Sequence, residues 1–438
     1  MKATVVGGGL AGCEAAWALA ERGVEVTLCE MRPVVATPAH RTDRLAELVC
    51  SNTFKSVELS NAHGLLKAEL RRLGSLLLEC ADEARVPGGA ALAVDRDLFS
   101  RAVQERVSGH PRINVVRREV DAIPSPAVIA TGPLTSDRLA SALAARLGTG
   151  ALAFYDAIAP VVADDSLDKS CLYALSRYGK GGGDDYLNAP MDAERYARFI
   201  EALTAADQFH AHEFDAVPYF EGCLPVEEMA RRGPDTLRFG PMKPVGLPDP
   251  RTGRVPHAVV QLRREDRAGQ MWSLVGFQTR LRVPEQKRVF SMIPGLGSAE
   301  YLRCGSIHRN SYVNSPASLG PALTLKDNAG VFLAGQMTGV EGYTESLGTG
   351  LLAGINLARS LRGLAPAVPP RTTMLGGLYG YLAEADPRHF QPMNANFGLL
   401  EPLAQPVKDK PRRHQLLVER ALADMDAFVR RVGVAVPA

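Results

Sequence analysis

The sequence of 438 residues has no apolar run that reaches the roughly 18 residues of a membrane-spanning helix. No signal peptide's apolar segment follows Met1. The seven cysteines are scattered without CxxC spacing, which argues against a disulfide framework and a zinc site. Scattered thiols in a chain of this size indicate a reducing compartment. We therefore expect a cytoplasmic protein with no metal ion and no membrane partner.

The sequence also has almost no excess of charge of either sign, since 50 basic and 48 acidic residues leave a formal charge of +2. No global field would attract nucleic acid, although a local basic surface is still allowed. Hydrophobic residues make up 46% and charged residues 22%, which is ordinary globular usage and excludes disordered and collagen-like chains. At roughly 150 residues per domain, the length predicts two to three domains.

The first 30 residues have the pattern of a strand, a helix and a second strand. Residues 2–6 and 24–29 are rich in β-branched residues, and the Ala-rich segment 12–21 between them is closed by Gly23. Such a βαβ unit builds a parallel sheet. Further strands are expected at 113–116, 127–130, 258–263, 272–277 and 331–334, and helices at 58–83, 347–361 and 414–432.

The middle of the chain differs from the rest in its sequence pattern, with a glycine cluster, several X-Pro breaks and strand-like runs. We read it as an insertion into the first domain. The prediction is an α/β protein in which a Rossmann-type FAD-binding domain of residues 1–153 and 298–438 is interrupted by an α+β domain of residues 154–297. Residues 298–438 include a C-terminal helical tail.

The strongest motif is a GxGxxG that follows the first strand and opens the first helix. Gly7 permits a tight turn, Gly9 lets a pyrophosphate approach the backbone, and Gly12 lets helix and strand pack closely. The helix N-terminus offers N–H donors to phosphates. Glu30 ends the second strand, where its carboxylate can accept from ribose hydroxyls. The residues expected at the dinucleotide are Gly7, Gly8, Gly9, Leu10, Ala11, Gly12 and Glu30.

Two later segments favour FAD over NAD as this dinucleotide. Residues 128–132 (VIATG) resemble a strand-end segment of two-dinucleotide flavoproteins, and residues 330–359 resemble their second FAD signature. A helix that starts near residue 347 would stabilise the anionic edge of reduced flavin. The common pattern has Asp where this sequence has Gln336. The further expected FAD contacts are Thr131, Gly132, Gly335, Gln336, Gly348 and Gly350.

Six segments together resemble the folate- and FAD-dependent tRNA (uracil-5-)-methyltransferases, the TrmFO family, which is related to the GidA flavoproteins. They are residues 48–56 (LVCSNTFKS), 220–229 (FEGCLPVEEM), 239–246 (FGPMKPVG), 275–280 (VGFQTR), 307–316 (IHRNSYVNSP) and 334–350. The resemblance implies formation of 5-methyluridine at position 54 in the T loop of tRNA. Methylenetetrahydrofolate would supply the carbon, and FADH2 the electrons, with NADH or NADPH as the reductant. Partners would be tRNA and tetrahydrofolate species, and no obligate protein partner is indicated.

The chemistry needs a thiolate, because C5 of uracil becomes nucleophilic only after something adds to C6. The resemblance implicates Cys223 and Cys50, and we assign the nucleophile to Cys223 and a flavin-side or protecting role to Cys50. The other five cysteines are expected to be packing residues. His308 is implied to stack on the pterin ring of the folate, whereas a core or gating role for Tyr343 is as plausible as folate contact.

Two basic groups are expected to contact tRNA phosphates, since few acidic residues neighbour them in the sequence. They contain Arg280, Arg282, Lys287 and Arg288, and in the tail Lys408, Lys410, Arg412, Arg413 and His414. No RNA-binding module with a sequence signature is visible, so recognition would use shape and a flipped or looped-out base.

Three alternatives stay open at this point. The chain could modify the wobble uridine as GidA relatives do, although its tail is shorter than theirs. It could be a small-molecule flavin oxidoreductase, which would leave the two cysteine motifs unexplained. It could also bind tRNA and flavin without catalysis. The sequence does not identify the base that takes the C5 proton, the preferred reductant, the tRNA determinants or the oligomeric state.

Overall fold

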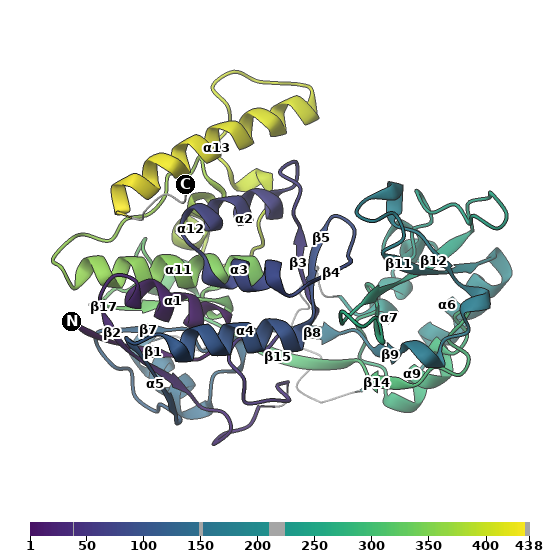
Figure 1. Cartoon of the computed structure of the whole chain (residues 1–438), viewed down its shortest axis with the longest axis horizontal. Coiled ribbons are helices and arrows are strands. Elements are labelled where there is room, and N and C mark those ends of the chain that lie inside the picture. Colours follow the sequence, from purple (N-terminus) through teal and green to yellow (C-terminus); the bar gives the residue numbers. More distant parts are fainter. Residues whose placement is uncertain (38, 149–151, 210–223, 434–438) are drawn as a thin grey trace.

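Strand β1 (Lys2–Val6) lies inside a six-stranded sheet that forms the centre of the left-hand lobe in Figure 1. The computed structural model describes residues 1–37, 39–148, 152–209 and 224–433. The strand order is β16 (Thr324–Leu325), β17 (Asn328–Leu333), β7 (Ala127–Ile129), β1, β2 (Glu25–Glu30) and β6 (Ile113–Arg117). Neighbours from β17 to β6 pair in parallel, which confirms the Rossmann-type fold. The pairing of β17 with β7 places segments 204 residues apart side by side, with Val331 opposite Ala127.

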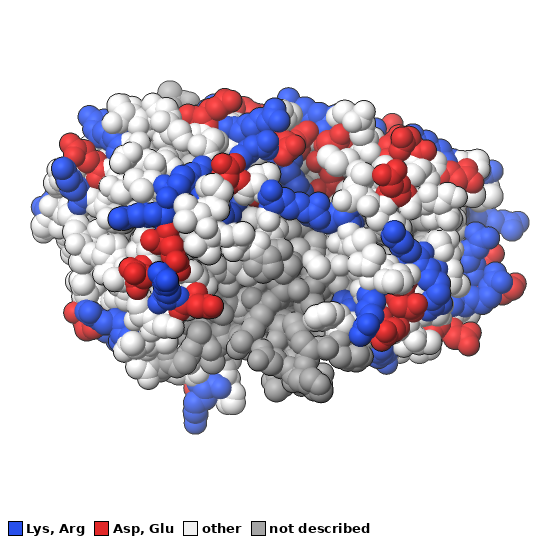
Figure 2. Space-filling view, turned by 90° about the horizontal axis from the view of Figure 1, so that it is seen from below, with Lys and Arg blue, Asp and Glu red and all other residues white. Residues whose placement is uncertain are grey.

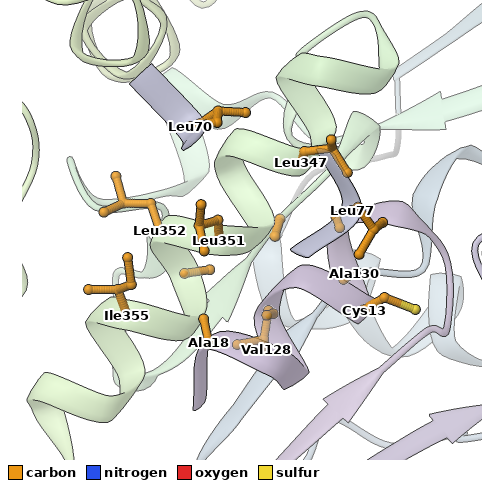
Figure 3. Packing of buried hydrophobic residues seen from close by; sticks show 14 of the residues in the cluster. Cys13, Ala18, Leu70, Leu77, Val128, Ala130, Leu347, Leu351, Leu352 and Ile355 are labelled. Carbon is orange, nitrogen blue, oxygen red and sulfur yellow. The ribbon is translucent and has the colours of Figure 1, made fainter. Parts of the chain in front are cut away.

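Helix α1 (Leu10–Ala20) packs against α11 (Tyr343–Ser360), and this contact fixes the second FAD-like segment against the first (Figure 3). The crossing is close because glycine faces backbone: a Cβ on Gly350 would clash with the backbone of Ala11. Leu347, Leu351 and Ile355 fill the space beside α1. The helix starts at Tyr343, four residues before the expected position.

The expected helix over residues 58–83 is two helices, α2 (Ala62–Arg72) and α3 (Leu76–Glu83). Gly74 has a φ of +82°, which ends α2, and Ser75 caps α3 by accepting a hydrogen bond from the Leu78 N–H. Beside them lies an antiparallel sheet of β3 (Thr53–Ser56), β5 (Ala91–Val94) and β4 (Arg85–Val86), followed by α4 (Arg96–Gly109). This sheet faces the second lobe (Figure 1).

The second lobe contains a separate six-stranded antiparallel sheet and its own hydrophobic core. The strand order is β10 (Tyr173–Ala174), β11 (Tyr186–Met191), β12 (Ala258–Arg264), β13 (Met271–Leu274), β9 (Val161–Ala163) and β14 (Tyr301–Arg303). Its helices are α6 (Ala193–Ala205), α7 (Val226–Arg231), α8 (Thr236–Phe239) and α9 (Val283–Phe290). Phe199, Phe277 and Phe290 are fully buried between sheet and helices. Strand β14 belongs to this sheet although it follows residue 297, so the second lobe extends to about residue 303.

Two antiparallel strands, β8 (Leu152–Ile158) and β15 (Ser306–Tyr312), connect the lobes (Figure 1). The C-terminal part adds α12 (Met374–Glu384) and α13 (Lys410–Val432), which begins four residues before the expected start and is capped by the Asp409 side chain. The remaining elements are α5 (Asp137–Leu147), α10 (Ser315–Ser318), η1 (Gly132–Leu134), η2 (Asp164–Ser166), η3 (Lys169–Cys171), η4 (Arg177–Gly179), η6 (Gln336–Thr338) and η7 (Phe397–Leu399). Within the described ranges, no helix has the length and apolar character needed to cross a membrane.

The predicted strands at 113–116 and 127–130 both exist, as β6 and β7, but they do not pair with each other. Strands β1 and β2 lie between them. This is the usual consequence of right-handed crossovers on both sides of a central strand, which local sequence patterns do not reveal.

Candidate functional site

A cavity of about 140 Å³ opens at the carboxyl ends of β1, β2 and β7, and we call it the Rossmann cavity. Ligands of open α/β sheets bind at this edge. Predicted FAD residues that line it are Gly7, Gly9, Leu10, Ala11, Glu30, Thr131, Gly132, Gly335 and Gln336. Segments near residues 7, 30, 130 and 335 therefore meet at one place, as the sequence analysis expected.

The three motif glycines have separate structural reasons. Gly7 has a φ of +101°, and a Cβ there would lie 2.5 Å from the Ala130 carbonyl oxygen. A Cβ on Gly12 would clash with the Gly7 carbonyl, so Gly12 is required for the close approach of helix to strand. A Cβ on Gly9 would meet nothing within 4 Å. Gly9 thus leaves open space beside the N-terminus of α1, where a phosphate can reach backbone N–H groups.

Glu30 is buried at the rim of the Rossmann cavity and remains ionised. Its carboxylate accepts hydrogen bonds from the Gly8 N–H at 2.8 Å and from Arg32 Nε at 2.9 Å. Burial alone raises the pKa of Glu30, but the hydrogen bonds and charge of Arg32 lower it below the ordinary value. Oε1 already accepts from both the backbone N–H and Nε of Arg32, whereas Oε2 accepts only from Gly8, so Oε2 can still accept from a ribose hydroxyl.

The second FAD-like segment, residues 330–359, closes the Rossmann cavity from the other side. Gly335 has a φ of +79°, and its N–H donates to Thr349 Oγ1 at 2.8 Å. The Gln336 side chain borders the cavity and donates to Glu341 Oε2 at 2.6 Å. Gly348 and Gly350 do not line either described cavity; they allow α11 to pack closely, Gly348 against Leu70 and Leu375. Direct FAD contact by these two glycines stays a prediction.

A second cavity of about 380 Å³ adjoins the first and lies between the lobes, and we call it the interlobe cavity. Val49, Pro133, Leu134, Gln336, Tyr343 and Ser346 border both. The lining residues that come from the first lobe include Cys50, Ser51, Thr53, Lys55, Glu341 and Asn394. Those from the second lobe and the connecting strands include Ile158, Arg263, Glu265, Gly276, Gln278, Arg303 and Asn310.

The loop that carries Cys50 is held at the boundary between the two cavities. The Tyr343 hydroxyl accepts from the Cys50 N–H at 2.9 Å and donates to the Ser51 carbonyl at 3.0 Å. The Cys50 carbonyl accepts from Arg96 Nη2 at 3.0 Å and from Arg303 Nη2 at 3.2 Å. Tyr343 therefore positions the cysteine loop from the first turn of α11, in addition to bordering both cavities.

Sequence reasoning missed the buried ionic cluster that supports this loop. Glu265 Oε2 accepts from Arg96 Nε at 2.6 Å, although the two residues lie on different lobes. Burial raises the pKa of Glu265, but the charges of Arg96 and Arg263 outweigh it and lower the pKa below its ordinary range. Burial and the charge of Arg96 lower the pKa of Arg303 to about 10. No local spacing could have revealed a cluster assembled from such distant segments.

Asn52 is a second link between the lobes. Its side-chain amide donates to the Val94 carbonyl at 3.0 Å and to the Arg264 carbonyl at 2.8 Å, and its oxygen accepts from Arg263 Nε at 2.9 Å. Asn52 is fully buried. It lies two residues after Cys50 in the segment 48–56, so this segment was a usable sequence signal although the role of Asn52 was not recognised.

The donor set of the Rossmann cavity fits a dinucleotide. An open glycine cradle, a helix N-terminus and an ionised acidic side chain provide for pyrophosphate and ribose. The first turn of α11 begins at the shared wall of the two cavities, through Tyr343 and Ser346. A flavin ring bound there would have the Cys50 loop on one side and the interlobe cavity beyond it.

The side chains of two predicted site residues, Cys223 and His308, are not among those that the structure describes. Cys223 lies outside the described residues. His308 lies in β15, where its backbone is opposite Asp156 of β8, beside the interlobe cavity residue Asn310. The assignments of nucleophile and pterin stacking therefore remain predictions.

Of the five cysteines expected to be packing residues, three are buried and two are half-buried. Cys13, Cys29 and Cys80 are buried, and burial raises the pKa of the Cys80 thiol to about 12. Cys171 and Cys304 are partly exposed. The Cys171 thiol donates to Asp168 at 3.4 Å on the surface of the second lobe.

The expectation of few acidic neighbours is also wrong for three predicted tRNA contacts. Arg280 is paired with Glu228 at 2.7 Å, Arg282 with Asp207 at 3.2 Å and Arg288 with Glu285 at 2.6 Å. Acidic and basic side chains are interspersed at both ends of the face in Figure 2. Lys287, Lys408 and Arg412 are exposed and have no ion pair with a described residue.

The chain is similar to known proteins over its whole length. The family model for glucose inhibited division protein A (GidA) matches residues 2–365. A protein of Geobacter sulfurreducens named methylenetetrahydrofolate--tRNA-(uracil-5-)-methyltransferase TrmFO is 59% identical, over 98% of this chain and 99% of its own. A protein of Dictyoglomus thermophilum with the same name is 53% identical over 99% of each chain.

A solved structure supports the fold independently. GidA of Aquifex aeolicus superposes with a TM-score of 0.73 and 17% sequence identity, over 99% of this chain and 74% of the GidA chain. At that identity the likeness concerns architecture, and it agrees with the two-lobed arrangement around a Rossmann-type sheet.

Proposed function

The chain belongs to the TrmFO family of methylenetetrahydrofolate–tRNA-(uracil-5-)-methyltransferases, a branch of the GidA family, and we propose that it forms 5-methyluridine at position 54 of tRNA. The observation that carries the proposal is the adjacency of the two cavities. A dinucleotide cradle shares a wall with a larger interlobe cavity, and the loop of Cys50 lies at that wall.

FAD would be held by the GxGxxG backbone, Glu30 and the strand ends at residues 131 and 335. In its reduced form, bound FAD would supply the two electrons that convert a methylene group into a methyl group. The cavity beyond the shared wall takes the remaining reactants, the folate and the uracil.

The chain's own part in the chemistry is to supply thiols and to position them. In the proposed mechanism, the Cys223 thiolate adds to C6 of uracil, which makes C5 nucleophilic toward the methylene carbon of the folate. As the methylene carbon bonds to C5, a base removes the C5 proton and the carbon–nitrogen bonds to the folate break, so that tetrahydrofolate leaves. The methylene group on C5 then gains a hydride equivalent, which reduced FAD would supply, and the thiolate leaves C6. Cys50 acts at the flavin side, where Tyr343, Arg96 and Arg303 fix its backbone.

The electrons come ultimately from NADH or NADPH in this proposal, and the protein acts in the cytoplasm. In this proposal the FAD-binding domain of residues 1–153 resumes at about residue 304 rather than 298, because β14 belongs to the sheet of the second, substrate lobe. Lys287, Lys408 and Arg412 are exposed cations suited to tRNA phosphates, with the ion-paired Arg280, Arg282 and Arg288 as weaker contributors.

One assay tests the proposal against its alternatives. The protein is incubated with unmodified tRNA, labelled methylenetetrahydrofolate and NADH, and the label is mapped in the RNA. Label at U54 supports the proposal, whereas label at the wobble uridine indicates GidA-like modification. Reduction of FAD without labelled RNA indicates a small-molecule oxidoreductase, and tRNA binding without either reaction indicates a non-catalytic protein.

A further inference from the structure

Lys55 has a backbone conformation that is unfavourable for a residue with a side chain. Its φ is +65°, in the left-handed region that glycine adopts readily and other residues seldom do. The pairing of β3 with β5 shifts register between Thr53 and Ser56, so Lys55 lies in a β-bulge. Bulges occur next to active sites, where they redirect a side chain.

The surrounding side chains hold this conformation in place. The Lys55 N–H donates to Thr53 Oγ1 at 3.0 Å. The carbonyl before it, of Phe54, accepts from Thr344 at 3.3 Å, and the carbonyl after it, of Ser56, accepts from the buried Lys67 ammonium at 2.9 Å. Strained backbone that is fixed by its neighbours on both sides is typical of functional positions.

The Lys55 side chain lines the interlobe cavity, on the same segment as Cys50. The other two cationic side chains of the cavity wall already have acceptors, because Arg263 donates to Asn52 and Arg303 donates to the Cys50 carbonyl. Of the acidic side chains there, Glu265 accepts from Arg96 and Glu341 accepts from Gln336.

The Lys55 ammonium, by contrast, makes no hydrogen bond or ion pair with any side chain in the described ranges 1–37, 39–148, 152–209 and 224–433. It acts at longer range on Glu345, whose oxygen lies 3.2 Å from His63 Nδ1. A strained lysine therefore presents to the cavity an ammonium group that has no direct ion-pair partner among the described residues.

We propose that Lys55 binds an oxyanion group of a substrate in the interlobe cavity. Two reactants of the proposed function, on which this inference rests, carry such a group: tRNA through its phosphodiesters and folate through its carboxylates. A lysine ammonium is a compact charge with three donors, and it pairs with either kind of oxygen.

The test uses two neutral variants that keep the left-handed backbone, Lys55→Gly and Lys55→Asn, together with Lys55→Arg, which keeps the charge. The control is Lys2→Ala, which removes an exposed charge at the far end of β1. Thermal stability and FAD content are measured first. The Gly variant is expected to be as stable as the wild type or more so, because glycine relieves the strain.

Affinities of the FAD-loaded proteins for a tRNA transcript and for tetrahydrofolate are then measured separately, beside the KM values. Loss of one charge-assisted contact should weaken the binding of one substrate about tenfold, with a smaller effect on kcat. If the oxyanion is a phosphate, tRNA affinity falls and its log–log salt slope decreases by about 0.7 to 0.9. If it is a carboxylate, tetrahydrofolate affinity falls and the tRNA salt slope is unchanged.

The inference is overturned if both neutral variants fold, retain FAD and bind both substrates within about twofold of the wild type. It is supported if one affinity falls in both neutral variants, is partly restored in Lys55→Arg and is unaffected in Lys2→Ala. The labelling assay on wild-type protein decides the proposed function independently, because the affinity measurements do not require turnover.

Discussion

The Rossmann cavity and the interlobe cavity share a wall but are built in opposite ways. The first is lined at its core by strand ends and by motifs that are contiguous in the sequence, such as residues 7–12. The second is formed mainly by side chains from both lobes, including Cys50, Arg263 and Arg303. A backbone cradle needs only small residues and a regular sheet, whereas the second cavity depends on how two lobes are joined.

This difference explains what each cavity tolerates. In the Rossmann cavity, an added side chain is the damaging change, since the glycines leave the space that a ligand needs. In the interlobe cavity, removal of a side chain is the damaging change, because buried charges there are matched across the lobe boundary. The following changes test that contrast, from the largest expected effect to the smallest.

Removal of a reactive thiol should have the largest effect. Cys223→Ala is expected to lose methyl transfer by at least about a thousandfold, because a covalent intermediate is lost, while tRNA affinity and FAD stay near wild type. Cys50→Ala should also lose activity and should alter flavin reduction by NADH. Cys171→Ala, at a partly exposed thiol in the second lobe, is the control and should be fully active. Normal turnover by Cys223→Ala would contradict the assigned nucleophile.

Neutralising Glu265 should destabilise the join between the lobes. Glu265→Gln leaves the guanidinium of Arg96 without its charge partner, and loss of one member of a buried pair costs about 3 kcal/mol. The comparison variant is Glu79→Gln, which breaks an exposed pair with Arg106 and should cost at most about 1 kcal/mol. Urea unfolding measures both, and equal effects would contradict the importance of the buried cluster.

The stability that Glu265 contributes should depend on pH in a defined direction. Because its folded pKa is lowered, the contribution is fully present above the unfolded pKa of about 4.3 and is lost as the pH falls through the folded pKa. The difference between wild type and Glu265→Gln should therefore be constant near pH 7 and shrink below about pH 4. A difference that grows on acidification would contradict this ionisation.

Gly9→Val should impair the Rossmann cavity without unfolding the chain. No atom lies within 4 Å of a Cβ at this position, so the side chain projects into ligand space. Overpacking costs about 1 to 3 kcal/mol. Taken from the binding free energy, that cost lowers FAD affinity about 5- to 150-fold. Gly109→Val, at another glycine with open space, should retain FAD. Gly12→Val is expected to misfold, because its Cβ would clash with the Gly7 carbonyl.

The smallest effects should come from the exposed cations. Lys287→Ala should lower the log–log salt slope of tRNA binding by about 0.7 to 0.9, the value for one phosphate contact. Arg282→Ala and Arg288→Ala should lower it less, since each is paired with a neighbouring carboxylate. Flavin content should be unchanged in all three. If Lys287→Ala leaves the slope intact, Lys408 and Arg412 are the next positions to vary.

The same contrast decides how much the sequence could reveal. Gly7, Gly12 and Gly335 were predictable because each meets a local requirement for a tight turn or a close backbone approach, and Glu30 because it ends a strand beside them. The helix break at Gly74 was missed because the leucine periodicity continues across it, while the Ser75 cap favours a new start. Helix α11 was expected too late, since its first turn, residues 343–346, is polar apart from its tyrosine and has no apolar stripe.

The interlobe cluster could not be predicted in the same way. Arg96, Glu265 and Arg303 are separated by 169 and 38 residues, and no local pattern relates them. The charge pairing of Arg280 with Glu228 was missed for the same reason, because Glu228 lies on α7, 52 residues away in the sequence. Family resemblance identified Cys50. The hydrogen bond from its backbone N–H to Tyr343 could not be predicted, because it depends on how α11 packs against the loop that carries Cys50.

The most direct test of the central claim is to trap the reaction with tRNA that contains 5-fluorouridine at position 54. Fluorine cannot leave C5 as a proton does, so the thiolate that adds to C6 stays bonded to the RNA. The account predicts a stable adduct with wild-type protein, none with Cys223→Ala, and RNA attached to the Cys223 peptide on mapping. RNA attached to Cys50 would reverse the two assignments, and RNA attached to neither cysteine would contradict the thiolate mechanism.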